Sequence, residues 1–252
     1  MRGEEKFSGK ATHYDSARPS YAESLLDVLY ADFGFSAQSV IADIGSGTGI
    51  FTEQLLKRGS TVYGVEPNAD MRETGEKRLK GYSNFISVSG DAVNTGLADN
   101  SIDIVTAAQA LHWFPLEEFR KECKRILKRN GKVVIVYNER SGGAVNEKIN
   151  AAIARRCDLG GASTGPAFIE ANQKKIDELY HGEFDEIRKS NSLLMDREKF
   201  ISYWLSRSYA PREGDKAYEP FIDDLNAIFD EYAKDDIITV EQQSVAYIGS
   251  LR

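Results

Sequence analysis

The chain has 252 residues, 41% of them hydrophobic and 28% charged, and carries a formal net charge of −7. This length can bury a sizeable core in one large domain. The acidic balance argues against a nucleic-acid partner, because phosphates favour clustered Lys and Arg. The two cysteines, Cys123 and Cys157, are too few for a disulfide framework or a zinc site, and no metal site is predicted.

The first 15 residues lack the apolar stretch of a signal peptide, and the sequence contains no run of 18 apolar residues. We therefore expect a cytoplasmic protein that does not bind a membrane.

In chain order, short β-rich runs alternate with amphipathic helical runs as far as Glu139. Two helices follow the first two strands, one over 48–59 and one containing Met71 and Leu79. A third helix is expected over 114–131, with Pro115 in its first turn and Gly131 at its end. Apolar strands separated by helices predict a parallel sheet covered on both faces. The five predicted strands are 39–45, 61–67, 84–92, 101–110 and 132–139.

After residue 139 the pattern becomes less regular. Strand-like runs over 185–196 and 237–251 are expected to complete the sheet. Helical runs over 197–210 and 218–235 lie between them and are expected to form a lid over one end. We expect one domain over 1–252, with a core at 12–139 and a helical lid or substrate region at 140–187 and 197–235.

The segment "IADIGSGTGIF", residues 41–51, places three glycines directly after the first strand. Ligands of open parallel sheets bind beyond the carboxyl ends of the strands, where glycine allows close backbone approach. The candidate ligands are a phosphate, a dinucleotide and S-adenosylmethionine. The spacing is G-x-G-x-G, whereas the dinucleotide fingerprint needs G-x-G-x-x-G, and the P-loop Gly-Lys-Ser/Thr is absent.

Five segments in order resemble the class I S-adenosylmethionine-dependent methyltransferases: "HYDSARPSY", "ADIGSGTG", "VEPNADM", "SGDA" and "AAQALHWF". The first is similar to the N-terminal lead-in of a small-molecule branch that includes trans-aconitate methyltransferases. The resemblance covers residues 12–139 well and the C-terminal part more loosely. It implies a Rossmann-like α/β fold with a mostly parallel seven-stranded sheet, helices on both faces and a helical lid.

The resemblance also implies roles for particular residues. Glu66 is expected to accept the ribose hydroxyls of the cofactor, Met71 to pack near its adenine, and Asp91 to meet the adenine amino group. The glycine turn would lie under the methionine part, and Asp43 could meet a cation or orient the turn. The full set of expected cofactor-binding residues is Tyr14, Arg18, Asp43, Gly45, Ser46, Gly47, Glu66, Pro67, Met71, Asp91, Ala92 and Gln109.

The acceptor is expected to be a small molecule, and S-adenosylhomocysteine the second product. A carboxylate acceptor would need cations but no base, which makes Arg140 and Arg207 candidates, with Trp113 as a further site-lining residue. A phenol, hydroxyl or carbon acid would instead need a proton acceptor, for which His112 is the candidate.

Two other functions are left open by the residues. A nicotinamide-dependent oxidoreductase would also place an acid after its second strand, although the glycine spacing and the lack of a Tyr-x-x-x-Lys pair count against it. A methyltransferase-like protein that binds the cofactor without catalysis is the second alternative. A nucleic-acid methyltransferase is disfavoured by the acidic charge and by "AAQALHWF" in place of an Asn/Asp-Pro-Pro-Tyr/Phe signature.

Overall fold

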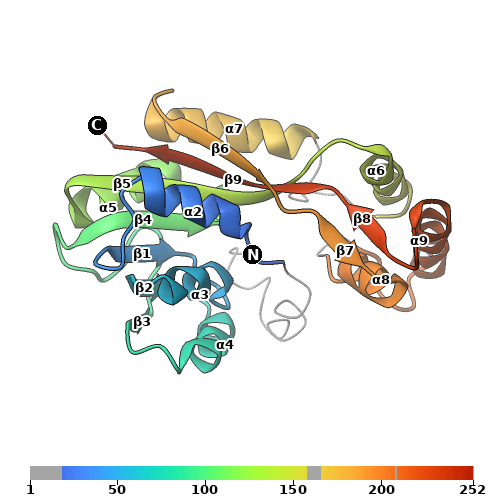
Figure 1. Ribbon diagram of the computed structural model, residues 1–252, viewed down its shortest axis with the longest axis horizontal. Helices are drawn as coiled ribbons and strands as arrows, with labels where there is room; N and C mark the ends of the chain where they lie inside the picture. The colour runs from blue at the N-terminus through green and yellow to red at the C-terminus, as the bar shows by residue number, and fades with distance from the viewer. Residues whose placement is uncertain (1–18, 158–165, 208, 252) are drawn as a thin grey trace.

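A seven-stranded sheet forms the centre of the molecule, as the computed structural model shows (Figure 1). The structure describes residues 19–157, 166–207 and 209–251. The strand order is β3-β2-β1-β4-β5-β9-β6, and the pairs from β3 to β5 are parallel. β9 runs antiparallel to both of its neighbours, β5 and the edge strand β6. These strands span Val40–Ile44 (β1), Thr61–Val65 (β2), Phe85–Val88 (β3), Ile102–Ala108 (β4), Leu127–Arg140 (β5), Asp185–Ser190 (β6) and Gln242–Gly249 (β9).

Helices cover both faces of this sheet, which confirms the predicted α/β class. Along β5, Val133 and Ile135 face one core cluster while Val134 and Val136 face another, as the two-residue period of a strand requires. The helices α2 (Glu23–Asp32), α3 (Ile50–Lys57) and α4 (Ala69–Leu79) contribute to one cluster, and α5 (Leu116–Ile126) and α7 (Pro166–Tyr180) contribute to the other.

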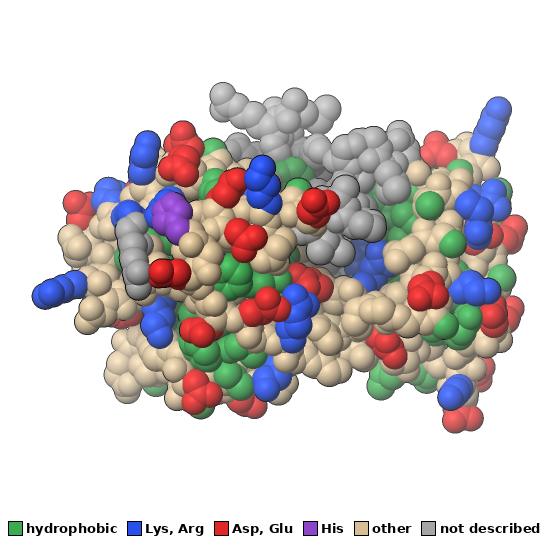
Figure 2. Space-filling model, turned by 90° about the horizontal axis from the view of Figure 1, so that it is seen from above, with side chains coloured by type: hydrophobic (Ala, Val, Ile, Leu, Met, Phe, Trp, Pro, Cys, Tyr) green, Lys and Arg blue, Asp and Glu red, His purple; other side chains and the backbone are tan. Residues whose placement is uncertain are grey.

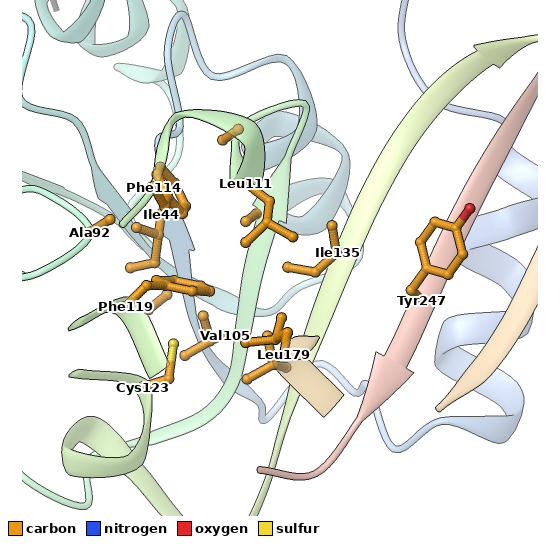
Figure 3. Close-up of a cluster of buried hydrophobic side chains, with 14 of the residues drawn as sticks. Ile44, Ala92, Val105, Leu111, Phe114, Phe119, Cys123, Ile135, Leu179 and Tyr247 are labelled. Atoms are coloured by element: carbon orange, nitrogen blue, oxygen red, sulfur yellow. The ribbon is translucent and has the colours of Figure 1, made fainter. Parts of the chain in front are cut away.

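The α5–α7 side of the core is shown in Figure 3. Phe119 and Cys123 of α5 are at most 1% exposed, and burial raises the pKa of the Cys123 thiol well above its usual value. Leu111 and Phe114, which follow β4, belong to the same cluster. The core therefore extends to the loop beyond the carboxyl end of β4.

Five further elements form a third cluster, here called the helical unit. It consists of α6 (Ala144–Arg156), α8 (Arg197–Leu205), α9 (Tyr218–Tyr232), β7 (Leu193–Met195) and β8 (Ile238–Val240). β7 and β8 pair with each other in a separate two-stranded sheet. In Figure 1 this unit lies to one side of the main sheet, and β5, β6 and β9 lead into it.

The structure corrects three sequence predictions. The helix expected over 114–131 ends at Ile126, because Leu127 pairs with Ile102 and begins β5 beside an irregularity in the register. The late strand-like runs each divide in two, and only β6 and β9 join the main sheet. The breaks fall where side-chain amides bind backbone: Asn191 Nδ2 donates to Ser20 O at 2.8 Å, and Asn146 Nδ2 to Glu241 O at 2.7 Å.

The third correction concerns the lid. The sequence predicts residues 140–187 as one part of the lid, but α7 packs on the sheet through Ile176, Leu179 and Tyr180. Tyr180 Oη also donates to the carbonyls of Val133 and Tyr247, each at 3.0 Å. Among the described helices, none is long and apolar enough to cross a membrane.

Candidate functional site

The glycine turn joins the carboxyl ends of β1 and β2. The backbone N–H groups of Gly45 and Ser46 both donate to Val65 O, at 2.8 and 3.2 Å. Gly45, Gly47 and Gly49 have φ of +72°, +57° and +80°, a region that favours glycine. A Cβ on Gly45 would lie 2.9 Å from Ala110 Cβ, so the turn packs tightly against the loop after β4.

Glu66, directly after β2, holds the turn from the other side. Its Oε2 accepts from Gly47 N at 2.9 Å and its Oε1 from Asn68 N at 2.9 Å. Asn68 in turn caps α4, because its side chain accepts from Met71 N at 3.0 Å. Glu66 is 8% exposed and Met71 is 6% exposed. The strand end, the glycine turn and the start of α4 therefore meet at one carboxylate.

Asp43 lies beneath the turn and is only 1% exposed. Its two oxygens accept from Thr52 Oγ1 at 2.6 Å and Thr106 Oγ1 at 2.8 Å. The pKa of Asp43 is raised to about 6, mainly by burial and to a smaller extent by the charge of Glu66, while these two hydrogen bonds oppose the rise. Asp43 therefore joins β1, α3 and β4 through its two hydrogen bonds.

Asp91 and Ala92 lie in the loop after β3. Asp91 Oδ1 accepts from the backbone N–H groups of Val93 and Asn94, each at 2.8 Å, so it organises a turn. Ala92 is buried in the same cluster as Ile44 and Phe114, close to the end of β1 (Figure 3). Asp91 thus lies at the carboxyl edge of the sheet, and one of its two carboxylate oxygens is hydrogen-bonded within its own loop.

The loop after β4 carries the next group of predicted residues. Gln109 has a φ of +55°, uncommon for a residue with a side chain, and its Nε2 donates to Asn138 O at 3.1 Å. His112 lies in a short 3-10 helix, Leu111–Trp113, and its ring is 4.8 Å from that of Trp113 and 6.4 Å from that of Tyr137. Trp113 is 40% exposed.

Lys175 of α7 was not predicted from the sequence, yet it secures this loop. Its Nζ donates to the carbonyls of His112 and Phe114, both at 3.1 Å, and of Leu111 at 3.5 Å. Burial lowers the pKa of the Lys175 ammonium. No spacing in the sequence links a residue of α7 to the loop after β4, so only the fold reveals this contact.

The two predicted substrate arginines lie together at the border between the sheet and the helical unit. The Arg140 guanidinium is 5.1 Å from the centre of the Trp204 ring, and that of Arg207 is 5.7 Å from the same centre. Arg207 also stacks 4.1 Å from the Tyr203 ring. Arg140 is the last residue of β5 and Trp204 lies in α8, so the pair spans two separate parts of the chain.

The other expected site residues lie as follows. Ser46 and Pro67 are half-buried beside the glycine turn and Glu66. Tyr14 and Arg18, expected at the cofactor, fall outside the residues that the structure describes.

Comparison with known proteins identifies relatives of this chain. Residues 42–135 match a family model described as a methyltransferase domain. An uncharacterised methyltransferase-like protein of Schizosaccharomyces pombe is 33% identical over 135 residues, which cover 53% of this chain and 52% of that protein. An uncharacterised methyltransferase of Geobacillus thermodenitrificans is 30% identical over 159 residues, covering 59% of this chain and 73% of that protein. The chain spans about half the length of most of the curated relatives it matches.

The fold has counterparts among solved structures. A protein of Anaeromyxobacter dehalogenans described as a type II methyltransferase superposes with a TM-score of 0.64 at 19% identity, covering 92% of this chain and 97% of that one. An S-adenosylmethionine-dependent methyltransferase of Aquifex aeolicus superposes with a TM-score of 0.52 at 13% identity, covering 95% and 98%. These likenesses confirm the fold.

The glycine turn also fits the cofactor that the sequence implies. A Cβ on Gly47 would meet only Met71 Cε within 4 Å among the described residues, at 3.6 Å. The space over Gly47 is thus bordered by an apolar methionine and by the Glu66 carboxylate, whose Oε2 accepts from Gly47 N. An apolar surface beside an acid suits an adenosine, whose base is flat and whose ribose presents hydroxyl donors.

Proposed function

Because this chain belongs to the class I S-adenosylmethionine-dependent methyltransferases, we propose that it transfers the methyl group of that cofactor to a small-molecule acceptor. S-adenosylmethionine carries an activated methyl group on a sulfonium, and its displacement leaves S-adenosylhomocysteine. The observation that carries the proposal is the meeting of Glu66, Gly47 and Met71 at the ends of β1 and β2.

The chain contributes binding and orientation. Glu66 is proposed to accept the ribose hydroxyls, Met71 and Pro67 to flank the base, and Asp91 and Ala92 to border its far side. Gly45, Ser46 and Gly47 would leave room for the methionine part, held in place by Asp43 from below. Tyr14, Arg18 and Gln109 complete the proposed cofactor contacts. Holding both reactants in line and excluding water supply most of the catalysis in such a site.

The acceptor is proposed to bind between the loop after β4 and the helical unit, which would act as the lid. Trp113, Arg140 and Arg207 border this region. A carboxylate acceptor needs no base, whereas for an acceptor that arrives protonated His112 is the proposed proton acceptor. In Figure 2 acidic and basic side chains are interspersed over the face shown, a distribution that supports a small-molecule acceptor over a nucleic acid.

The test is turnover with a labelled methyl group. The protein is incubated with methyl-tritiated S-adenosylmethionine and small carboxylic acids, phenols and amines, together with a metabolite ultrafiltrate from a bacterial culture. We expect a labelled small product and a matching amount of S-adenosylhomocysteine, both lost in Glu66→Ala. Binding of S-adenosylhomocysteine without methylation of any acceptor would instead favour the non-catalytic cofactor-binding alternative.

A further inference from the structure

Arg140, Arg207 and Trp204, here called the arginine–indole cluster, concentrate positive charge at the border of the helical unit. Two guanidiniums lie within 5.7 Å of the centre of one indole ring that is 1% exposed. Both charges also act on Tyr209. Burial raises the pKa of the Tyr209 hydroxyl, and the positive charges of Arg207 and Arg140 oppose this rise. Positive charge from two separate parts of the chain therefore gathers around one buried ring.

Arg140 differs from other arginines that stack on aromatic rings. Arg58 lies 5.3 Å from the Tyr30 ring centre and binds Asp27 at 2.7 Å. Arg197 lies 4.4 Å from the Phe229 ring centre and binds Asp230. Within the described part of the chain Arg140 forms no ion pair, and the neighbouring Glu139 carboxylate is bound by Arg188 at 2.8 Å.

Two donors in the cluster are buried without an acceptor. Arg140 Nη1 and Trp204 Nε1 have almost no exposed surface and no hydrogen-bond partner among the described residues. A buried donor without an acceptor is costly, and native proteins rarely leave one unless a ligand, ion or water satisfies it. Both groups only donate, so the ligand they lack is an acceptor.

The cluster lies within reach of the proposed methyl-transfer site. Gln109, at the end of β4, donates to Asn138 O of β5 at 3.1 Å. Arg140 is two residues further along β5, a step of roughly 7 Å at the rise of a β-strand. A small acceptor anchored at the cluster can therefore extend back towards the loop that carries His112 and Trp113.

We propose that the arginine–indole cluster is the subsite that binds a carboxylate of the acceptor, with the Arg140 guanidinium and Trp204 Nε1 as its donors. This assignment rests on the proposed function. A carboxylate matches the planar donor fork of arginine, and it is the acceptor that two donors of this kind require.

The test uses the two tryptophans of the chain. In a Trp113→Phe background, Trp204 is the only indole and reports directly on the cluster. Succinate is titrated in the presence of saturating S-adenosylhomocysteine, at constant ionic strength set with sodium chloride. We expect a saturable change in Trp204 fluorescence with succinate and none with the neutral succinamide or with further sodium chloride.

Matched variants in the same background identify the arginine. Arg140→Gln should weaken the binding of succinate about tenfold or more, as expected for the loss of a charge-assisted hydrogen bond. Arg140→Lys keeps the charge but loses the forked donor, so its affinity for succinate should lie between that of Arg140→Gln and that of the starting protein. Arg197→Gln is the control, since it removes a stacked arginine of α8 that already has the Asp230 partner.

The outcomes separate the two proposals. If S-adenosylhomocysteine binds but succinate leaves Trp204 unchanged, or chloride acts equally well, the carboxylate subsite is wrong and the methyltransferase proposal stands. The subsite is also wrong if Arg140→Gln binds succinate as tightly as Arg197→Gln does. If the starting protein does not bind S-adenosylhomocysteine, the proposed function itself fails.

Discussion

At the scale of single residues, Asp43 is the group whose burial has the clearest measurable consequence. It is 1% exposed and accepts hydrogen bonds from the hydroxyls of Thr52 and Thr106, and burial outweighs them, so that its pKa rises to about 6. The unfolded chain has an ordinary carboxyl pKa near 4. Between these values the folded protein binds the proton more strongly than the unfolded chain does.

This difference predicts how stability depends on pH. The contribution of Asp43 is fully present below about pH 4 and is lost as the pH rises through about 6, because the ionised form is the one that burial penalises. Relative to Asp43→Asn, the wild-type free energy of unfolding should fall by about 2–3 kcal/mol between pH 4 and pH 7. Urea unfolding of both proteins at four pH values measures this difference in the free energy of unfolding.

The exposed Asp32→Asn is the control for removing one negative charge. Glu122 acts in the opposite direction, because Arg125 and Thr95 hold its pKa at about 2, and its contribution is lost as the pH falls. Glu122 is present in every variant, so it cancels from the comparison. A difference between wild type and Asp43→Asn that does not change with pH would show that Asp43 is not buried as described.

At the scale of elements, the loop after β4 depends on a helix distant in sequence. Lys175 of α7 binds three carbonyls of that loop, and Gly45 of the turn packs against Ala110 in it. The contacts form a continuous path from α7 to the glycine turn. We therefore expect Lys175 to be a positioning residue, which acts on the proposed cofactor site through the loop.

We predict that Lys175→Met destabilises the protein by about 1–2 kcal/mol, because buried carbonyls lose their donor. It should also weaken S-adenosylhomocysteine binding several-fold in calorimetry, and Lys175→Arg should restore part of both. The matched control is Lys174→Met, the next residue of α7, whose ammonium is 3.9 Å from Glu178 and whose side chain is 78% exposed. Equal behaviour of the two Met variants would refute the positioning role.

Local sequence patterns predict most of the strands and helices, whereas features that depend on long-range pairing were missed. The strands from β1 to β5 follow from apolar runs, and the meeting of Gly47 with Glu66 follows from two adjacent strand ends at one sheet edge. The boundary between α5 and β5 was missed because Leu127 is defined by its pairing with Ile102, not by its neighbours. For the same reason the pairing of β7 with β8 was not foreseen.

In the candidate site too, sequence motifs identify individual residues but not the contacts between distant parts of the chain. The motifs predict cofactor residues at the carboxyl edge of the sheet, where Gly47, Glu66 and Asp91 lie, and Arg140 and Arg207 are predicted as cations. Their common partner, Trp204, was not, because a stacking contact between β5 and α8 exists only after the helical unit has folded. Nor does any sequence pattern show that Thr52 and Thr106 would enclose Asp43.

At the scale of the whole molecule, the main sheet and the helical unit meet beside one proposed reaction site. The sheet and its helices carry the proposed cofactor residues, while the helical unit has its own cluster around Phe200, Trp204 and Phe229. Arg140 is the end of a sheet strand and stacks on a ring of the helical unit. An acceptor bound at this border would contact both parts, which gives the helical unit its proposed role in selecting and enclosing the acceptor.

The central claim, that the turn between β1 and Glu66 holds an adenosyl-sulfur cofactor, is tested most directly by thermal unfolding. The melting temperature is measured with S-adenosylmethionine, S-adenosylhomocysteine, NAD or NADP, all at one concentration. A ligand at 100 times its dissociation constant adds about 2.7 kcal/mol, which raises the midpoint of a domain of this size by roughly 5–10 °C. We predict this rise with the two adenosyl-sulfur ligands alone, and its loss in Glu66→Ala. A rise with the nicotinamide cofactors only, or with none of the four, would contradict the account.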